Sequence, residues 1–559
     1  MTLTTMKKIN IKVFGVLALI AGFAISCKQD VITFTTPKPV YNKWKVGDAD
    51  FTKFISIGNS LTSGYQAGAL FTAGQQNSFP AILSKQFSLA KDSTGATTLT
   101  FNQPDINSVN GYSSSVTIGP NTVELGRYIL FASDGNPNDA LPTPAGYPGV
   151  PAPYNTAGPG FSDPTFYAIT FDKTKLNNFG VPGILLGQCL IGATGGPSTN
   201  NPYFNPYYAR FASTPGTSTI IGDALAAAPT FFTFDLGNND VLGYATTGGD
   251  NSIPITSQAN FQTYYQNAVG ALLTNSTAKG VVTTIPDVTT IPFFNTVSYN
   301  AIPLTSDEVT QLMGATAFGG YNQVMQGLAG ALTAAPGNFG LDAAHAAPII
   351  AQINTRLVNY VVGNNPILLY DNSLIDMGPF FDGMLLAGAI TSQQRAGLVP
   401  YEQIRQANST DLICLTTGSV LGTLVGNNPL YINGVSVPLG DKYVLIKQEQ
   451  DSVATAVTGY NSFIKGFAAA NSSRLAVADV NAAFTSLVIN QAYVSDGVMI
   501  TPSFVPPFGA FSEDGVHPNS RGYAYMANII IDAINSTFNA NVPHASLAAY
   551  SGTGLPVTP

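Results

Sequence analysis

Five short apolar segments constrain the possible folds of this chain more than any other feature. Each ends at or near a Gly, Pro or Asn, and they cover residues 54–57, 176–181, 231–236, 281–285 and 475–480. Segments with helical periodicity lie between and after them, at residues 79–87, 260–275, 453–470 and 521–538. Short apolar runs that alternate with helices are typical of a parallel sheet covered on both faces. We therefore predict a three-layer α/β/α core with functional loops at the carboxyl ends of its strands.

Two long stretches interrupt this pattern. Residues 92–172 are rich in Gly, Pro, Tyr and Asn, with one hairpin signal around residues 119–121. Residues 296–448 contain a second hairpin signal, Asn433-Gly434, flanked by residues 430–432 and 435–437. This second stretch also has helical patterns at residues 307–333 and 347–362. Connections of this length without structure of their own are unusual, so we interpret both stretches as inserted subdomains.

The charge balance excludes one class of partner. The chain has 23 Lys and Arg against 31 Asp and Glu, a net charge of −8, and only 10% of its residues are charged. Binding to a phosphate backbone needs a basic face, so we expect no nucleic-acid partner. A hydrophobic fraction of 45% is enough for a sizeable core and excludes disorder throughout the chain.

The first residues have the order of a targeting segment. Lysines at residues 7, 8 and 12 lead into an apolar run at residues 13–23, which is too short to span a bilayer. Small residues then lead to Cys27. This order resembles a bacterial lipoprotein signal peptide, in which the cysteine receives the lipid; an ordinary secretory signal that contains a cysteine is the alternative.

The lipoprotein interpretation predicts an organisation for the whole chain. Residues 1–26 would be the signal peptide, 27–50 a lipid-anchored tether, 51–540 the main domain and 541–559 a C-terminal tail. We expect attachment to the membrane through the N-terminal lipid only, and a location in the bacterial cell envelope, at the outer membrane.

Cys189 and Cys414 are the other two cysteines, and both lie in apolar surroundings. Buried free thiols are the simpler interpretation, and a disulfide between them stays open. Cys and His residues show no metal-ligand spacing, so we expect neither a metal nor a cofactor.

The first apolar segment leads into Gly-Asn-Ser-Leu-Thr-Ser-Gly at residues 58–64. A serine on a glycine-flanked turn from strand to helix exposes its hydroxyl at the sheet edge, where it could act as a nucleophile. Ser60 holds that position. By itself this composition is also that of an ordinary turn.

The chain has only three histidines, so a general base has few candidates. Asp514 precedes His517 by three residues; its carboxylate could accept the Nδ1 proton and leave Nε2 to take a serine proton. The alternative is a surface turn before a helix that starts near residue 521, capped by residue 519 or 520. Asp342 and His345 have the same spacing in an Ala-rich segment, which we interpret as helix interior, and His544 has no such partner. Spacing alone does not choose between the two pairs.

Four motifs taken together resemble the SGNH, or GDSL-type, hydrolase superfamily. In chain order they are Gly-Asn-Ser-Leu at 58–61, Asn-Phe-Gly-Val-Pro-Gly at 178–183, Gly-Asn-Asn-Asp at 237–240 and Asp-Gly-Val-His at 514–517. The resemblance covers the core strands and their loops. It implies a flavodoxin-like α/β/α sandwich with a five-stranded parallel sheet, and the two large insertions lie outside it.

The resemblance also implies roles for individual residues. Ser60 would be the nucleophile and would complete a catalytic triad with His517 and Asp514. The oxyanion hole would consist of the Ser60 amide, Gly183 and Asn239.

Asn59, Gly180 and Asp240 lie close to these residues in the sequence. Asn59 stands where the family commonly has Asp, so local hydrogen bonding must differ. Gly180 lies three residues before Gly183, which is favoured because it closes the Asn-x-Gly-x-x-Gly motif. We expect Asp240 to hold its loop and not to contact substrate.

The implied activity is hydrolysis of carboxylic esters without a metal, on either a lipid or an acylated glycan. The many Phe and Tyr residues, 33 and 25, suit an acyl pocket or a large core. The alternative is a non-catalytic envelope lipoprotein that uses the same scaffold and its insertions to bind glycan, lipid or a partner protein.

Overall fold

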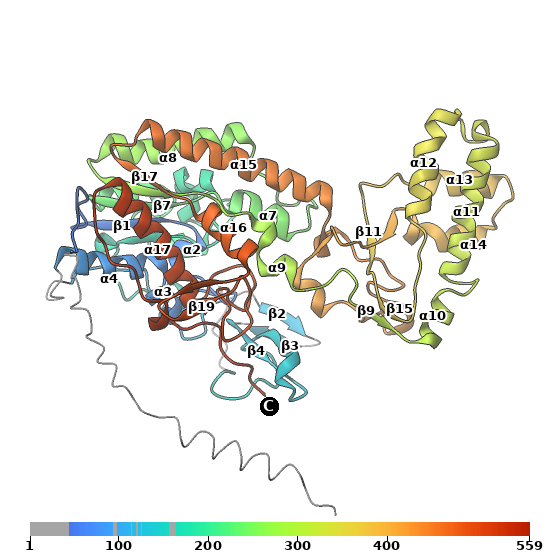
Figure 1. Cartoon of the computed structure of the whole chain (residues 1–559), viewed down its shortest axis with the longest axis horizontal. Coiled ribbons are helices and arrows are strands. Elements are labelled where there is room, and N and C mark those ends of the chain that lie inside the picture. Colours follow the sequence, from blue (N-terminus) through green and yellow to red (C-terminus); the bar gives the residue numbers. More distant parts are fainter. Residues whose placement is uncertain are drawn as a thin grey trace, which may run out of the picture. The chain divides into compact units, whose positions relative to one another are not determined.

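A computed structural model of the chain (Figure 1) describes residues 44–92, 98–112, 115–118, 121–124, 126–155 and 164–558. The predicted signal peptide and Cys27 lie outside the described residues. Trp44–Pro559 forms one compact unit.

A single five-stranded parallel sheet organises this unit, in the order β17-β8-β7-β1-β6. Its strands are β1 (Phe54–Gly58), β6 (Asn178–Gly180), β7 (Phe231–Asp235), β8 (Lys279–Thr283) and β17 (Leu475–Ala478). Numbered along the chain this order is 2-1-3-4-5, as in flavodoxin-like folds. The predicted α/β fold is confirmed, and each of the five apolar segments supplies one strand.

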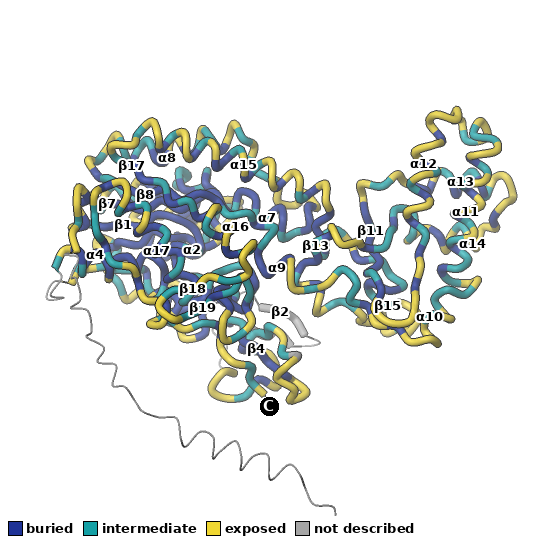
Figure 2. The backbone as a smooth tube through the Cα atoms, in the orientation of Figure 1, coloured by how far each residue is buried: buried dark blue, intermediate teal, exposed yellow. Residues whose placement is uncertain are grey.

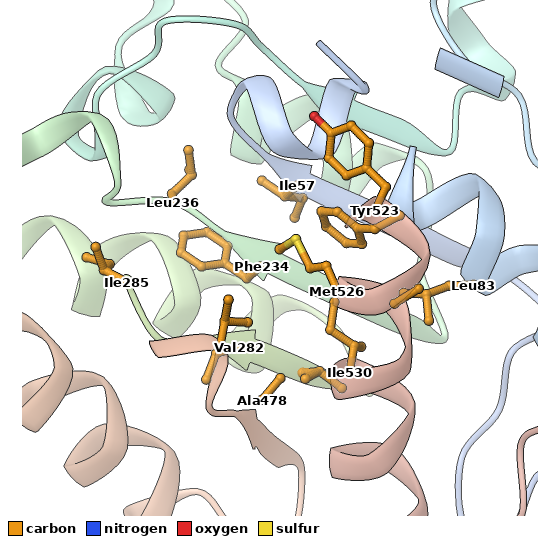
Figure 3. Packing of buried hydrophobic residues seen from close by; sticks show 14 of the residues in the cluster. Ile57, Leu83, Phe234, Leu236, Val282, Ile285, Ala478, Tyr523, Met526 and Ile530 are labelled. Atoms are coloured by element: carbon orange, nitrogen blue, oxygen red, sulfur yellow. The ribbon is translucent and has the colours of Figure 1, made fainter. Parts of the chain in front are cut away.

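Helices cover both faces of the sheet, which explains why the strands are unbroken apolar runs. Helices α4 (Phe79–Lys91) and α17 (Ser520–Thr537) pack on one face, and α8 (Gln258–Asn275) and α15 (Lys447–Ala470) on the other (Figure 1). Every residue of β1 and β7 is buried as a result, as the dark tube of Figure 2 shows. Figure 3 shows Met526 and Ile530 of α17 against Phe234 and Val282 of the sheet.

Shorter elements complete the core and lie mostly in the loops between strands. The helices are α2 (Ser60–Ser63), α3 (Thr72–Gln76), α5 (Pro206–Ala209), α6 (Ile220–Ala226), α7 (Asn239–Thr246), α9 (Pro292–Asn295) and α16 (Val480–Asn490). A hairpin of β18 (Tyr493–Ser495) and β19 (Val498–Ile500) precedes α17.

The first insertion packs into the main core. The predicted hairpin is confirmed, because β2 (Ser115–Ile118) pairs antiparallel with β3 (Asn121–Glu124). A second hairpin joins β4 (Tyr128–Phe131) to β5 (Leu141–Pro144), and Val557 bonds to the other edge of β4. Buried side chains from this stretch belong to the main hydrophobic cluster: Ile106, Tyr112, Leu130 and Phe166.

The second insertion has a separate hydrophobic core formed by residues between 302 and 446. Its helices are α10 (Ser306–Leu312), α11 (Phe318–Ala334), α12 (Ala343–Thr355), α13 (Gly378–Leu386) and α14 (Ser392–Leu398). Its strands are β9 (Ile302–Leu304), β10 (Gly363–Asn365), β11 (Leu368–Tyr370), β12 (Ile404–Gln406), β13 (Leu412–Ile413), β14 (Leu424–Val425), β15 (Asn428–Ile432) and β16 (Val444–Leu445). They pair as short antiparallel ribbons.

Two local predictions for this insertion were wrong. The helix predicted over 307–333 is two helices, α10 and α11, interrupted between Leu312 and Phe318. The hairpin predicted at Asn433-Gly434 does not form, because β15 pairs with the preceding β14. The Ile432 carbonyl accepts the amides of residues 435–437, which closes a tight turn instead of starting a return strand.

Both ends of the described unit are tied to the core. The Asp48 amide donates to the Phe538 carbonyl at the end of α17, and Lys45 pairs with Asn541. Lys45 and Asp48, which lie in the predicted tether, are therefore bonded to α17 and the residues that follow it. Residues 545–557 likewise bond to α17 and β4.

Candidate active site

Ser60 lies at the carboxyl end of β1, where the chain turns into the one-turn helix α2. The Asn59 side chain caps this helix by accepting the Leu61 amide at 2.9 Å. A cap of this kind needs only a side-chain oxygen, so Asn59 supplies what an aspartate would supply. Ser60 is 7% exposed and is therefore largely buried.

His517 and Asp514 belong to a compact turn that leads into α17. The Ser512 amide donates to the His517 carbonyl at 2.8 Å and closes the turn. One Asp514 oxygen accepts the amides of Val516 and His517, each at 2.8 Å. The other lies 2.9 Å from His517 Nδ1. Asp514 thus fixes both the backbone and the ring of the histidine. Asn519 caps the helix that follows, so this segment is a capped turn as well as a candidate site.

The structure brings Ser60 and His517 together although 457 residues separate them. His517 Nε2 lies 2.9 Å from Ser60 Oγ, and Asp514 lies on the opposite side of the ring. An aspartate on Nδ1 leaves the Nε2 lone pair facing the hydroxyl, which is the arrangement a serine nucleophile needs.

Asp514 stays ionised in this environment. Burial would by itself raise the pKa of Asp514, but the adjacent His517 and the hydrogen bonds to the carboxylate hold it below its ordinary value. A fixed negative charge beside Nδ1 stabilises the imidazolium that forms when His517 accepts a proton.

Gly183 and Asn239 follow the two strands next to β1. Gly183 has a φ of +75° and open space where a Cβ would lie, whereas a Cβ at Gly180 would collide with the backbone of α2. The Gly180 amide already donates to Asn178 Oδ1 at 2.9 Å. No hydrogen bond from the Ser60 or Gly183 amide forms within the described chain. These observations favour Gly183 over Gly180 as a donor to substrate.

Hydrogen bonds connect the loops after β6 and β7. The Asn239 side chain donates to the Ile184 carbonyl at 2.9 Å, which leaves its second N–H available. Asp240 accepts the Leu186 amide at 2.9 Å and the Thr256 hydroxyl at 2.7 Å. Burial raises the pKa of Asp240 to about 6. Asp240 therefore holds its loop, as expected from the sequence.

Within the described residues, the rings of the other two histidines bond to aspartates and not to a serine. Asp342 Oδ1 lies 2.8 Å from His345 Nδ1, but Asp342 is the N-cap of α12, so His345 lies in the first helical turn and not in the helix interior that we predicted. Both side chains are largely exposed, at 65% and 75%. His544, which has no aspartate three residues before it, lies with its Nε2 2.7 Å from Asp532 of α17, because the C-terminal segment packs back on that helix.

Cys189 and Cys414 are both buried and both free. Within the described ranges, no set of three or more His, Cys, Asp or Glu side chains is arranged to hold a metal ion. None of the helices in these ranges combines the length and apolar character required to cross a membrane.

Glu513, directly before Asp514, gives a prediction about stability. It is 8% exposed and borders a cavity of about 260 Å³ that Arg127 also lines. Burial raises the pKa of Glu513 to about 7 from an ordinary value of 4.5. A carboxyl whose pKa is higher in the folded than in the unfolded protein stabilises the folded state at low pH. For Glu513 this stabilisation is lost as the pH rises from about 4.5 to about 7.

We therefore expect Glu513→Gln to raise the free energy of unfolding by about 3 kcal/mol at pH 8 and to change it little below pH 4.5. Urea denaturation at both pH values measures the difference. Equal pH dependence in the variant and the wild type would show that the native Glu513 carboxyl titrates normally.

Searches of family models, of curated proteins and of solved structures find no match to this chain. The fold and site define an α/β protein with a five-stranded parallel sheet and a Ser-His-Asp arrangement at the carboxyl edge of that sheet.

Proposed function

We propose that this protein is a serine ester hydrolase of the SGNH type. One observation supports this most strongly: the hydrogen-bonded series from Ser60 Oγ through His517 to Asp514, with separations of 2.9 Å on both sides of the ring. The order of the four motifs and the flavodoxin-like strand order add to it. In open α/β sheets, ligands also bind at the carboxyl ends of the strands, beside the point where the strand order reverses.

The proposed reaction proceeds in two stages. His517 Nε2 removes the Ser60 proton as Oγ attacks the ester carbonyl carbon and forms a tetrahedral oxyanion. Collapse breaks the bond to the alcohol, which takes the proton from Nε2 and leaves an acyl-Ser60. Water, deprotonated by the same nitrogen, attacks the acyl carbonyl and releases the carboxylic acid and free Ser60.

The oxyanion would be held by the amides of Ser60 and Gly183 and by the free N–H of Asn239. These donors are fixed by the protein backbone before substrate binds, so they need little reorganisation during the reaction. Each donor is typically worth about 3 kcal/mol of transition-state stabilisation.

Two measurements test this proposal directly. A panel of nitrophenyl esters of rising acyl length should reveal hydrolysis and the acyl length that the site prefers. A fluorophosphonate probe should react once per chain, and peptide mass mapping should place the adduct on Ser60. Absence of hydrolysis together with absence of labelling would favour the non-catalytic binding protein.

Asn239→Ala tests the oxyanion hole. We expect kcat to fall about 10²- to 10³-fold, because one preorganised donor is lost. The melting temperature should change little, since the Asn239 side chain makes a single hydrogen bond, to Ile184. Steady-state kinetics and a thermal melt measure the two effects, and a kcat within twofold of wild type would exclude Asn239 from the site.

Localisation is part of the proposal. We propose that Cys27 carries a lipid that anchors the protein in the bacterial cell envelope, at the outer membrane. Radiolabelled palmitate should be incorporated in a bacterial host, and Cys27→Ala should lose at least nine-tenths of the label and leave the membrane fraction. Unchanged labelling of Cys27→Ala would contradict the anchor.

A further inference from the structure

A tight turn beside the triad has an unusual backbone. Gln66 and Ala69 exchange two backbone hydrogen bonds of 3.2 Å, and the two residues between them, Ala67 and Gly68, have φ values of +52° and +73°. Positive φ at both central positions defines a type I′ turn, which ordinarily selects Gly, Asn or Asp. Ala67 adopts this conformation despite its Cβ, so the surrounding structure must hold the turn in place.

The amides of this turn hold the triad carboxylate. The Gly68 amide donates to Asp514 Oδ2 at 2.8 Å, the same oxygen that faces His517 Nδ1. The Ala67 amide donates to Ser512 Oγ at 2.8 Å, and this hydroxyl lies 3.1 Å from Asp514 Oδ1. A shift of the turn would therefore move both oxygens of Asp514 relative to the imidazole.

The first insertion supports the turn through Tyr128, the first residue of β4. The Tyr128 amide donates to the Ala67 carbonyl at 2.6 Å. Its ring lies directly against Gly68, because a Cβ at Gly68 would be 2.5 Å from Tyr128 Cδ2. Burial raises the pKa of Tyr128, and the negative charge of Asp514 raises it further, as expected for a hydroxyl close to that carboxylate.

Strand β4 is itself fixed on both edges. It pairs with β5 on one edge, and on the other the Val557 amide donates to the Leu130 carbonyl at 2.8 Å. The position of Tyr128 is therefore determined by the insertion and the C-terminal segment.

We propose that Tyr128 is a positioning residue for Asp514: its ring and amide hold the turn at residues 66–69, and the turn's amides orient the carboxylate toward His517. This inference rests on the proposed function. It assigns the first insertion a role in catalysis although it contributes none of the proposed reacting groups.

The test compares three variants of the full chain. Tyr128→Ala removes the ring and should lower kcat for a nitrophenyl ester about 10- to 100-fold with KM unchanged, because small misplacements of catalytic groups have effects of this size. Tyr128→Phe keeps the ring and should restore kcat to within twofold of wild type. Phe131→Ala removes a ring from the same strand, where it packs with Ile129 and Val150, and should leave kcat unchanged.

A second readout does not depend on turnover. The downfield NMR resonance of the proton between His517 Nδ1 and Asp514 reports their hydrogen bond directly. It should weaken or shift in Tyr128→Ala and stay unchanged in the other two variants. An unchanged resonance and a wild-type kcat in Tyr128→Ala would overturn the inference and leave the proposed function intact. If the wild type hydrolyses no ester, the proposed function fails, and the resonance still decides whether Tyr128 positions Asp514.

Discussion

On the proposed function, we expect Ser60→Ala to lower kcat for ester hydrolysis by about 10⁶-fold. The reason is that Ser60 Oγ is the hydroxyl 2.9 Å from His517 Nε2, and without it no acyl-enzyme forms. The remaining rate would come only from the oxyanion donors and substrate binding. Steady-state assays with the best nitrophenyl ester of the panel measure the loss, and the fluorophosphonate adduct should disappear with it.

Ser63→Ala is the matched control for this prediction. Ser63 is in the same helical turn and is also buried, but its hydroxyl donates to the Ser60 carbonyl at 2.9 Å. We expect it to keep kcat within about tenfold of wild type and to keep the label. If Ser60→Ala retained both hydrolysis and labelling, the nucleophile would lie elsewhere.

The second large effect distinguishes two histidines that have the same spacing from a preceding aspartate. Both have an aspartate three residues earlier, with Nδ1 to carboxylate separations of 2.9 Å for His517 and 2.8 Å for His345. Within the described residues, only His517 has a serine hydroxyl at Nε2, and its side chain is 14% exposed against 75% for His345. We expect His517→Ala to lose about 10⁶-fold in kcat and His345→Ala to match the wild type.

Parallel kinetics on the two variants, with circular dichroism to verify folding, give a direct comparison. Equal losses of kcat in both variants would mean that the two Asp-His pairs affect activity by stabilising the fold. A loss in His345→Ala alone would refute the assignment of the general base.

The core of the fold was predictable because its signals are local. Each of the five apolar segments became a strand of the sheet, and their continuous apolar character follows from burial on both faces. The four predicted core helices are present with ends shifted by up to six residues, the largest shift being at the start of α15. Prediction was poorer in the second insertion, because the pairing of its short strands depends on packing. There β15 pairs with β14 and not with residues 435–437.

The candidate site was predictable only in part. Ser60, Asp514 and His517 belong to short motifs that are visible in the chain, and a family resemblance selected His517 over His345. The support from residues 66–69 and Tyr128 had no such signal, because Ala67 and Gly68 look like ordinary turn residues and Tyr128 like one of many tyrosines. The partner of His544 was also missed, since Asp532 lies on another element.

Periodicity, turn chemistry and the order of motifs were thus available from the linear chain, because they depend on neighbours within a few residues. The sheet order, the meeting of Ser60 with His517 across 457 residues and the contact of Tyr128 with Gly68 were decided by tertiary packing. The physical reason is that such contacts depend on how buried surfaces fit together, and no local preference along the chain encodes the distance between two remote side chains.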